Sequence, residues 1–259
     1  MTDELVHLRV AAGVATITLD SPRNRNALSR QLVTELSWRL DAAAGDAATR
    51  AVVLTHTGGT FCAGADLSEA KEGGMAEGTK ALLRLLRDIV TLPKPVVARI
   101  DGNARAGGLG LIGACDIVVA SESSSFAFTE ARLGLAPAII SLTVLPRLDS
   151  RAAGRYFLTG EKFIGPVAER IGLVTCSAVD VDRALEEILA GLRAGSPQGL
   201  AESKKLVSAE VLAMLEQRGE DMAELSARLF GSEEALEGMT SFLRRRPPRW
   251  AIEPAADSS

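Results

Sequence analysis

The feature that most restricts the fold is a run of closely spaced glycines at residues 107–113, which is followed almost at once by a β-branched segment. Gly108, Gly110 and Gly113 match the G-x-G-x-x-G pattern of dinucleotide-binding folds. In those folds a helix of about ten or more residues separates the glycines from the next parallel strand. Here the next predicted strand begins at Ile117, and a helix of about two turns cannot make that crossover. The spacing therefore argues against a nucleotide-binding fold.

The first two-thirds of the chain alternates short strands with helices. Strands are predicted where apolar and β-branched runs end at turn signals, at residues 14–19, 51–55, 95–100, 117–120 and 126–129. Helices are predicted where leucines recur every three or four residues, between Leu28 and Gly45 and between Leu82 and Pro93. The glycine-containing, charged residues 68–78 are predicted to form a mobile loop, and residues 101–106 a second loop.

From residue 141 onward the pattern is almost entirely helical. Ser196 and Pro197 read as a helix cap followed by a first-turn proline. The sequence therefore predicts an α/β core at residues 1–195 and a helical C-terminal region at residues 196–259. That region is too small for a core of its own, so we expect it to pack on the α/β core or on another subunit.

Composition limits the chemistry that the chain can carry. Two histidines and three cysteines leave little room for a multi-histidine metal site or a disulfide framework. The formal net charge of −4 argues against nucleic acid as a partner. The acidic N-terminus does not resemble a signal peptide, and no apolar run approaches the roughly 20 residues of a membrane span. We expect a cytoplasmic protein without a membrane partner, whose chemistry depends on carboxylates and backbone groups.

Two segments rich in small residues are candidates for backbone hydrogen-bond donors. Gly107 follows a loop and begins the short helix, where the first amides have no partner within the helix. Tight packing of the helix against a strand is the alternative explanation for its glycines. In the second segment Ala65 could supply another amide, and Asp66 reads most simply as a cap or turn residue. Cys62 is more typical of a buried structural thiol than of a nucleophile.

Glu130 is the candidate side chain for acid–base chemistry. It follows a strand that ends in Phe128, and desolvation beside apolar neighbours would raise its pKa toward the range of a general acid or base. An ion pair with Arg132 is the alternative structural role.

Several motifs, in order along nearly the whole chain, resemble the enoyl-CoA hydratase/isomerase (crotonase) family. They are residues 21–28 (SPRNRNAL), 61–67 (FCAGADL), 94–98 (KPVVA), 101–102, 107–108, 115–117, 130–137 and 237–242. Residues 129–141 are most similar to bacterial enoyl-CoA hydratases of the methylglutaconyl-CoA hydratase type.

The resemblance implies a core of ββα units arranged as a superhelix, with C-terminal helices that build homotrimers or hexamers. It implies an acyl-CoA substrate and no separate cofactor, because CoA is part of the substrate. Ala65 and Gly107 would donate amides to an oxyanion, and Glu130 would be the acid–base group. Substrate-binding positions carried over from the family are Arg25, Ala27, Ala63, Asp66, Leu67 and Gly108. Arg23 and Arg25 are candidates for contact with the CoA phosphates, or else solvated loop residues.

One position departs from the family pattern. Typical hydratases carry a first glutamate on the short glycine-rich helix, and this chain has Gly110 there. A hydratase with one glutamate is the leading hypothesis. A Δ3,Δ2-enoyl-CoA isomerase, which moves a proton between C2 and C4, is the alternative, and an acyl-CoA-binding protein without turnover is the third.

Overall fold

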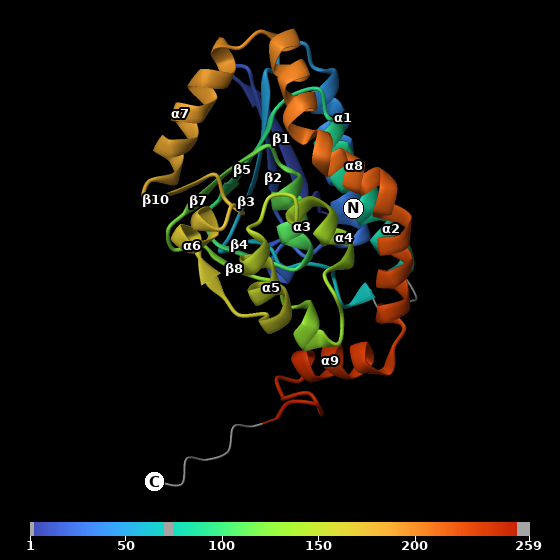
Figure 1. Cartoon of the computed structure of the whole chain (residues 1–259). Coiled ribbons are helices and arrows are strands. Elements are labelled where there is room, and N and C mark those ends of the chain that lie inside the picture. Colours follow the sequence, from blue (N-terminus) through green and yellow to red (C-terminus); the bar gives the residue numbers. More distant parts are fainter. Residues whose placement is uncertain (1–2, 70–74, 253–259) are drawn as a thin grey trace.

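A repeated strand–strand–helix unit builds the α/β part of the molecule, which we describe from a computed structural model covering residues 3–69 and 75–252 (Figure 1). The elements of the successive units are β1 (Val6–Ala11), β2 (Val14–Leu19) and α1 (Arg30–Gly45); β3 (Ala51–His56), β4 (Thr60–Cys62) and α2 (Met75–Thr91); β5 (Val96–Ile100), β6 (Asn103–Arg105) and α3 (Gly107–Ala114); and β7 (Ile117–Ser121), β8 (Ser125–Ala127) and α4 (Ala138–Val144). The order confirms the predicted α/β class and the ββα repeat.

The two strands of most units go to two different sheets. The larger sheet has the order β1-β2-β3-β5-β7-β10, with β10 at Cys176–Ala178, and the smaller one has the order β4-β6-β8-β9, with β9 at Phe163–Ile164. Within the smaller sheet β4, β6 and β8 are parallel neighbours. Their carboxyl ends therefore meet at one edge, and the chain segments that leave these ends lie close together. In open α/β sheets such an edge is where ligands bind.

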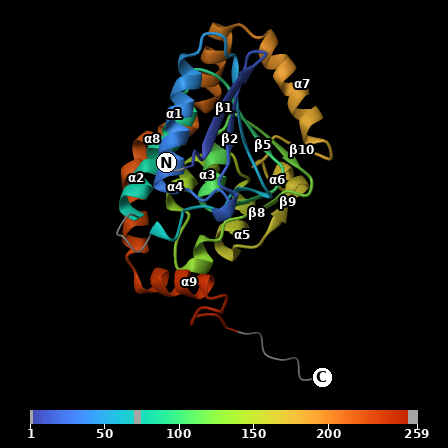
Figure 2. The ribbon, with the colours of Figure 1, turned by 180° about the vertical axis from the view of Figure 1, so that it is seen from behind.

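Both faces of the larger sheet are covered (Figures 1 and 2). On β3, Val52 and Leu54 belong to the main core, which also includes side chains of α1, α2 and α8. The alternate residues Ala51 and Val53 face the other way and pack with side chains of α7 (Val181–Ala194). This alternation follows from the two-residue period of a strand.

Helices complete the C-terminal part of the chain. The remaining elements are the 3-10 helices η1 (Pro22–Asn24) and η3 (Glu130–Leu133), then α5 (Ser150–Thr159), α6 (Gly165–Arg170), α8 (Pro197–Phe230) and α9 (Glu233–Leu243). The Ser196 hydroxyl caps α8 by accepting the Gly199 N–H at 3.1 Å, as predicted. The long α8 lies along α2 (Figure 1), and α9 packs on η3, where Gly238 lies too close to the Leu133 carbonyl for any side chain.

Some predicted boundaries are wrong. The strand β6 lies inside the predicted loop at residues 101–106, and β9 and β10 interrupt the stretch after residue 141 that was predicted to be helical. These strands have two or three residues, too few to show a period. The edge strand β1 was missed because most of its residues are exposed. Of the predicted loop at residues 68–78, residues 75–78 belong to α2 and residues 70–74 lie outside the described residues. Among the helices that the structure describes, none is both long and apolar enough to cross a membrane.

Candidate functional site

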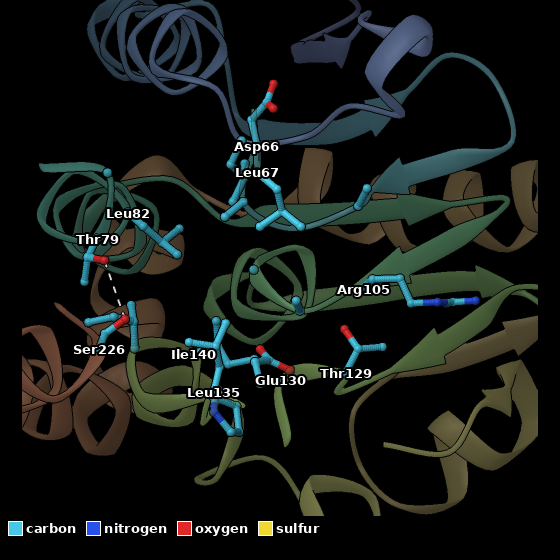
Figure 3. A pocket seen from close by; sticks show the side chains of 18 of the residues that line it. Asp66, Leu67, Thr79, Leu82, Arg105, Thr129, Glu130, Leu135, Ile140 and Ser226 are labelled. Carbon is cyan, nitrogen blue, oxygen red and sulfur yellow. Dashed lines mark hydrogen bonds between the residues drawn. The ribbon is translucent and has the colours of Figure 1, made fainter. Parts of the chain in front are cut away.

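A pocket of about 1070 Å³ lies at the carboxyl ends of β4, β6 and β8 (Figure 3). Helices α1, α2, α4, α8 and α9 complete its walls. Most of the site residues predicted from the sequence line it, namely Arg25, Ala63, Ala65, Asp66, Leu67, Gly107 and Glu130. Ala27 and Gly108 are both buried and are not among the lining residues. The fold thus brings together residues that lie up to 105 positions apart in the sequence, from Arg25 to Glu130.

The segment after β4 approaches the segment after β6 very closely at Gly64. Its φ is +93°, and a Cβ at this position would lie 2.9 Å from the Ala106 Cβ and 3.3 Å from the Gly107 nitrogen. Only glycine fits both the backbone conformation and the contact. The bridge to Leu28 uses the Gly64 carbonyl and the Asp66 N–H, and within the described residues the Ala65 N–H between them has no acceptor.

The segment after β6 turns sharply into α3. Ala106, the residue before the helix, has φ +45° and ψ −118°, a conformation that non-glycine residues rarely adopt. Gly107 is the first helical residue, so its N–H has no partner within the helix. Strain of this kind is typical of functional sites, where surrounding packing maintains it. Two amides without internal acceptors therefore lie on neighbouring segments of the pocket wall.

The other glycines of α3 serve packing. A Cβ on Gly108 would lie 2.8 Å from the Cys62 carbonyl oxygen, one on Gly110 would lie 2.6 Å from Ile140 Cγ2, and one on Gly113 would lie 2.8 Å from the Thr143 carbonyl oxygen. Tight packing against β4 and α4 therefore explains these three residues. Gly107 alone among the α3 glycines lines the pocket.

Glu130 begins η3 three residues after the end of β8, and its side chain enters the pocket beside Ile140 (Figure 3). The residue is 8% exposed, and its Oε2 has no hydrogen-bond partner among the described residues. Burial raises the pKa of Glu130 to about 7, because desolvation disfavours the charged form. The alternative ion pair with Arg132 is wrong, since the Arg132 Nε donates to the Thr159 carbonyl at 2.8 Å and lies outside every ion pair found in the described chain.

Asp66 and Cys62 have the structural roles that the sequence favours. The Asp66 carboxylate accepts the Ser68 N–H at 3.0 Å, the Ser68 hydroxyl at 2.7 Å and the Asn24 side-chain amide at 3.1 Å. Burial raises the pKa of Asp66, but these hydrogen bonds outweigh it, so the pKa is lowered overall. Burial raises the pKa of the Cys62 thiol to about 12, which is incompatible with a nucleophile at neutral pH. No cluster of three or more metal-ligating side chains is present in residues 3–69 and 75–252.

The loop that carries Arg25 is anchored by a residue that the sequence did not single out. Asn26 is fully buried; its side chain accepts the Ser21 N–H at 2.6 Å and donates to the carbonyls of Thr57 at 3.2 Å and Thr60 at 2.7 Å. Arg25 itself is exposed at the pocket rim. The exposed Arg23 does not line the pocket.

Three further parts of the pocket wall were missed. They are Thr129, the apolar segment from Leu135 to Ile140, and the hydroxyl pair Thr79–Ser226, whose oxygens are 3.5 Å apart between α2 and α8 (Figure 3). Thr129 is adjacent to Glu130 in the sequence, and this adjacency is the signal that could have identified it. Ser226 joins the site only through the packing of α8, which no local pattern encodes.

Comparisons with known proteins match this chain to one family. The family model described as enoyl-CoA hydratase/isomerase matches residues 9–253. The chain belongs to this family. A protein of Rhodobacter capsulatus named "Probable enoyl-CoA hydratase" is 34% identical over 261 residues, covering 96% of this chain and 99% of the relative. The crystal structure of an enoyl-CoA hydratase from Mycobacterium avium is 54% identical, with a TM-score of 0.90 over 96% of this chain and 100% of the other. An enoyl-CoA hydratase from Shewanella pealeana, 31% identical, has a TM-score of 0.75 over 95% of this chain and 96% of the other.

Proposed function

We propose that this member of the enoyl-CoA hydratase/isomerase family is a hydratase, which adds water across the C2–C3 double bond of a 2-enoyl-CoA. The observation that carries the proposal is the convergence, in one pocket, of a buried glutamate with an unpartnered oxygen and two segments with free amides. The names of the relatives from Rhodobacter capsulatus and Mycobacterium avium support the same reaction.

Glu130 is proposed to be both the base and the acid. Its carboxylate takes a proton from water while the water oxygen bonds to C3, and the π electrons of the double bond move to give an enolate. The N–H groups of Ala65 and Gly107 donate to the enolate oxygen, where negative charge develops. The protonated Glu130 then gives its proton to C2, and the thioester carbonyl forms again. A pKa of about 7 suits both steps, because both protonation states are populated near neutral pH.

Binding of the CoA portion is proposed to involve the pocket rim around Arg25. Its exposed guanidinium is suited to a phosphate, and Ala63, Asp66 and Leu67 line the adjacent wall. Ala27 and Gly108 are buried behind this wall, and we propose that they support it by packing. The reaction needs no cofactor, since CoA belongs to the substrate. We further propose a cytoplasmic homotrimer or hexamer, as in the family.

Isomerisation of a 3-enoyl-CoA is the second candidate, and Gly110 favours it. Ile140 fills the space next to Gly110, so a side chain there has no room. Among the carboxylates described in the pocket wall, only Glu130 is buried. A single carboxylate is sufficient to move a proton from C4 to C2.

The purified protein should be incubated with crotonyl-CoA, 3-methylglutaconyl-CoA and a 3-enoyl-CoA while the absorbance of the conjugated thioester is followed. Hydration lowers the absorbance with the first two, and this is the result we expect. A rise with the 3-enoyl substrate and no change with the others would establish the isomerase instead. Binding without any change in absorbance would establish an acyl-CoA-binding protein and contradict both.

A further inference from the structure

Thr129 precedes Glu130 at the N-cap position of η3, but its hydroxyl does not cap the helix. A threonine at this position ordinarily accepts a backbone N–H two or three residues further on. Here, within the part of the chain that the structure describes, the Thr129 hydroxyl has no hydrogen-bond partner. The residue is half-buried and lines the pocket, and Figure 3 shows it on the same side as Glu130. The Thr129 hydroxyl is therefore available in the pocket as a hydrogen-bond donor and acceptor, whereas a capping hydroxyl would already be bonded to a backbone N–H.

Glu130 and Thr129 together offer the polar groups that a bound water needs. The Oε2 of Glu130 is buried without a partner, and a bound water stabilises such a site when two or more polar groups surround it. The apolar Leu135 and Ile140 line the same part of the wall and offer no hydrogen bond (Figure 3). Arg105 cannot serve, because its guanidinium points away from Glu130 and donates to Ala104 and Ser125.

We propose that Thr129 binds the water that attacks C3, an inference that rests on the proposed hydratase function. The water donates one hydrogen to the Glu130 carboxylate, which takes it as a proton, and the other to the Thr129 Oγ1. A lone pair of the water oxygen is then free to form the bond to C3. The hydroxyl of Thr129 gains and loses no proton in this step. In this arrangement one hydroxyl performs the positioning of water, and Glu130 alone transfers protons.

The test compares Thr129→Val, which keeps the shape and removes the hydroxyl, with Thr129→Ser, which keeps the hydroxyl. Thr91→Val is the matched control, since Thr91 is exposed at the end of α2 and does not line the pocket. With crotonyl-CoA we expect kcat to fall about 10- to 100-fold in Thr129→Val, the effect of losing one hydrogen bond at the reacting water. We expect Thr91→Val to hydrate as the wild type does, and Thr129→Ser to lose much less activity than Thr129→Val because it keeps the hydroxyl.

Two further readouts separate this role from a structural one. Binding of butyryl-CoA, a saturated analogue that cannot be hydrated, is expected to be unchanged in Thr129→Val, and so is the pH at which hydration by this variant reaches half its maximum. Full hydration by Thr129→Val, equal loss in Thr129→Ser, or weakened butyryl-CoA binding would overturn the role of Thr129 while leaving the hydratase in place. If the wild type hydrates none of the enoyl-CoA substrates, the proposed function itself fails and this role fails with it.

Discussion

Asp116 and Glu130 both have carboxylates with little exposure, but they differ in their hydrogen-bond and ion-pair partners. The Asp116 side chain is 7% exposed, and its oxygens accept from the Lys204 ammonium at 2.8 Å, the Val96 N–H at 2.7 Å and the Ser208 hydroxyl at 3.2 Å. Glu130 is 8% exposed and has one oxygen without any partner in the described chain. The first carboxylate joins α8 to the core, and the second lines the pocket.

The difference separates a structural charge from a reactive one. A buried carboxylate paired with a buried ammonium holds two elements together, and its removal leaves the partner charge uncompensated. A buried carboxylate without a charged partner has a raised pKa and can exchange protons near neutral pH. Burial alone therefore does not identify the functional residue; Glu130 is singled out because it is a buried carboxylate that both lines the pocket and has an oxygen without a partner in the described chain. The predictions below test each side of this comparison.

The largest effect is expected from Glu130→Gln, which keeps the size of the side chain and removes its ability to take a proton. Hydration of crotonyl-CoA is expected to fall about 10²- to 10⁴-fold, the usual contribution of a general base. Steady-state kinetics measures the loss, and butyryl-CoA binding shows that the pocket persists. Full activity in the variant would contradict the role of Glu130.

The opposite phenotype is expected from Asp116→Asn. Lys204 is then buried without its counter-charge, and we expect the free energy of unfolding to fall by about 3–5 kcal/mol. Urea unfolding measures this, and the kcat of the folded fraction is expected to be unchanged. The double variant Asp116→Asn/Lys204→Met is the control, and it should recover much of the stability because the buried ammonium is removed together with its counter-charge. A double variant as unstable as the single one would show that the ion pair is not the cause.

Glu130 is also expected to lower stability as pH rises. Its folded pKa of about 7 lies above the unfolded value of 4.5, so the folded state binds more protons between these pH values. Glu130 therefore removes stability between about pH 4.5 and pH 7, by at most about 3 kcal/mol. The free energies of unfolding of wild type and Glu130→Gln should be compared at several pH values. The stability of the variant relative to the wild type is expected to increase as pH rises. A difference independent of pH would refute the raised pKa.

The smallest effect concerns the space next to Glu130. We expect Gly110→Ala to lower the free energy of unfolding by about 1–3 kcal/mol, because the new Cβ would lie 2.6 Å from Ile140 Cγ2. Ile140→Ala removes that atom, so the double variant should be more stable than the sum of the single changes predicts. Thermal unfolding of the four proteins measures the coupling. Strict additivity would show that Gly110 and Ile140 do not compete for the same space.

The sequence predicts the parts of this site that depend on local patterns. Glycine at position 107, small residues around Ala65 and a glutamate after an apolar strand each have a local signature, and the resemblance to the family joined them into one site. The parallel order of β4, β6 and β8 could not be obtained locally, because β4 and β6 are too short to show a period.

The features that the sequence did not predict depend on contacts between residues far apart in the chain. Ser226 reaches the pocket through the packing of α8, and the Asp116–Lys204 pair joins positions 88 residues apart. The glycines of α3 illustrate the converse. The sequence left open whether they serve ligand approach or helix packing, and the three-dimensional contacts show that three of the four pack against carbonyls and Ile140.

The pH dependence of hydration tests the central claim most directly, namely that a buried carboxylate without a partner is the base. We predict that kcat/KM for crotonyl-CoA rises with pH through an inflection near 7, because the charged form of Glu130 accepts the proton from water. The residual rate of Glu130→Gln should lack this inflection. An inflection near 4.5, as for an exposed glutamate, or one that persists in Glu130→Gln, would contradict the account.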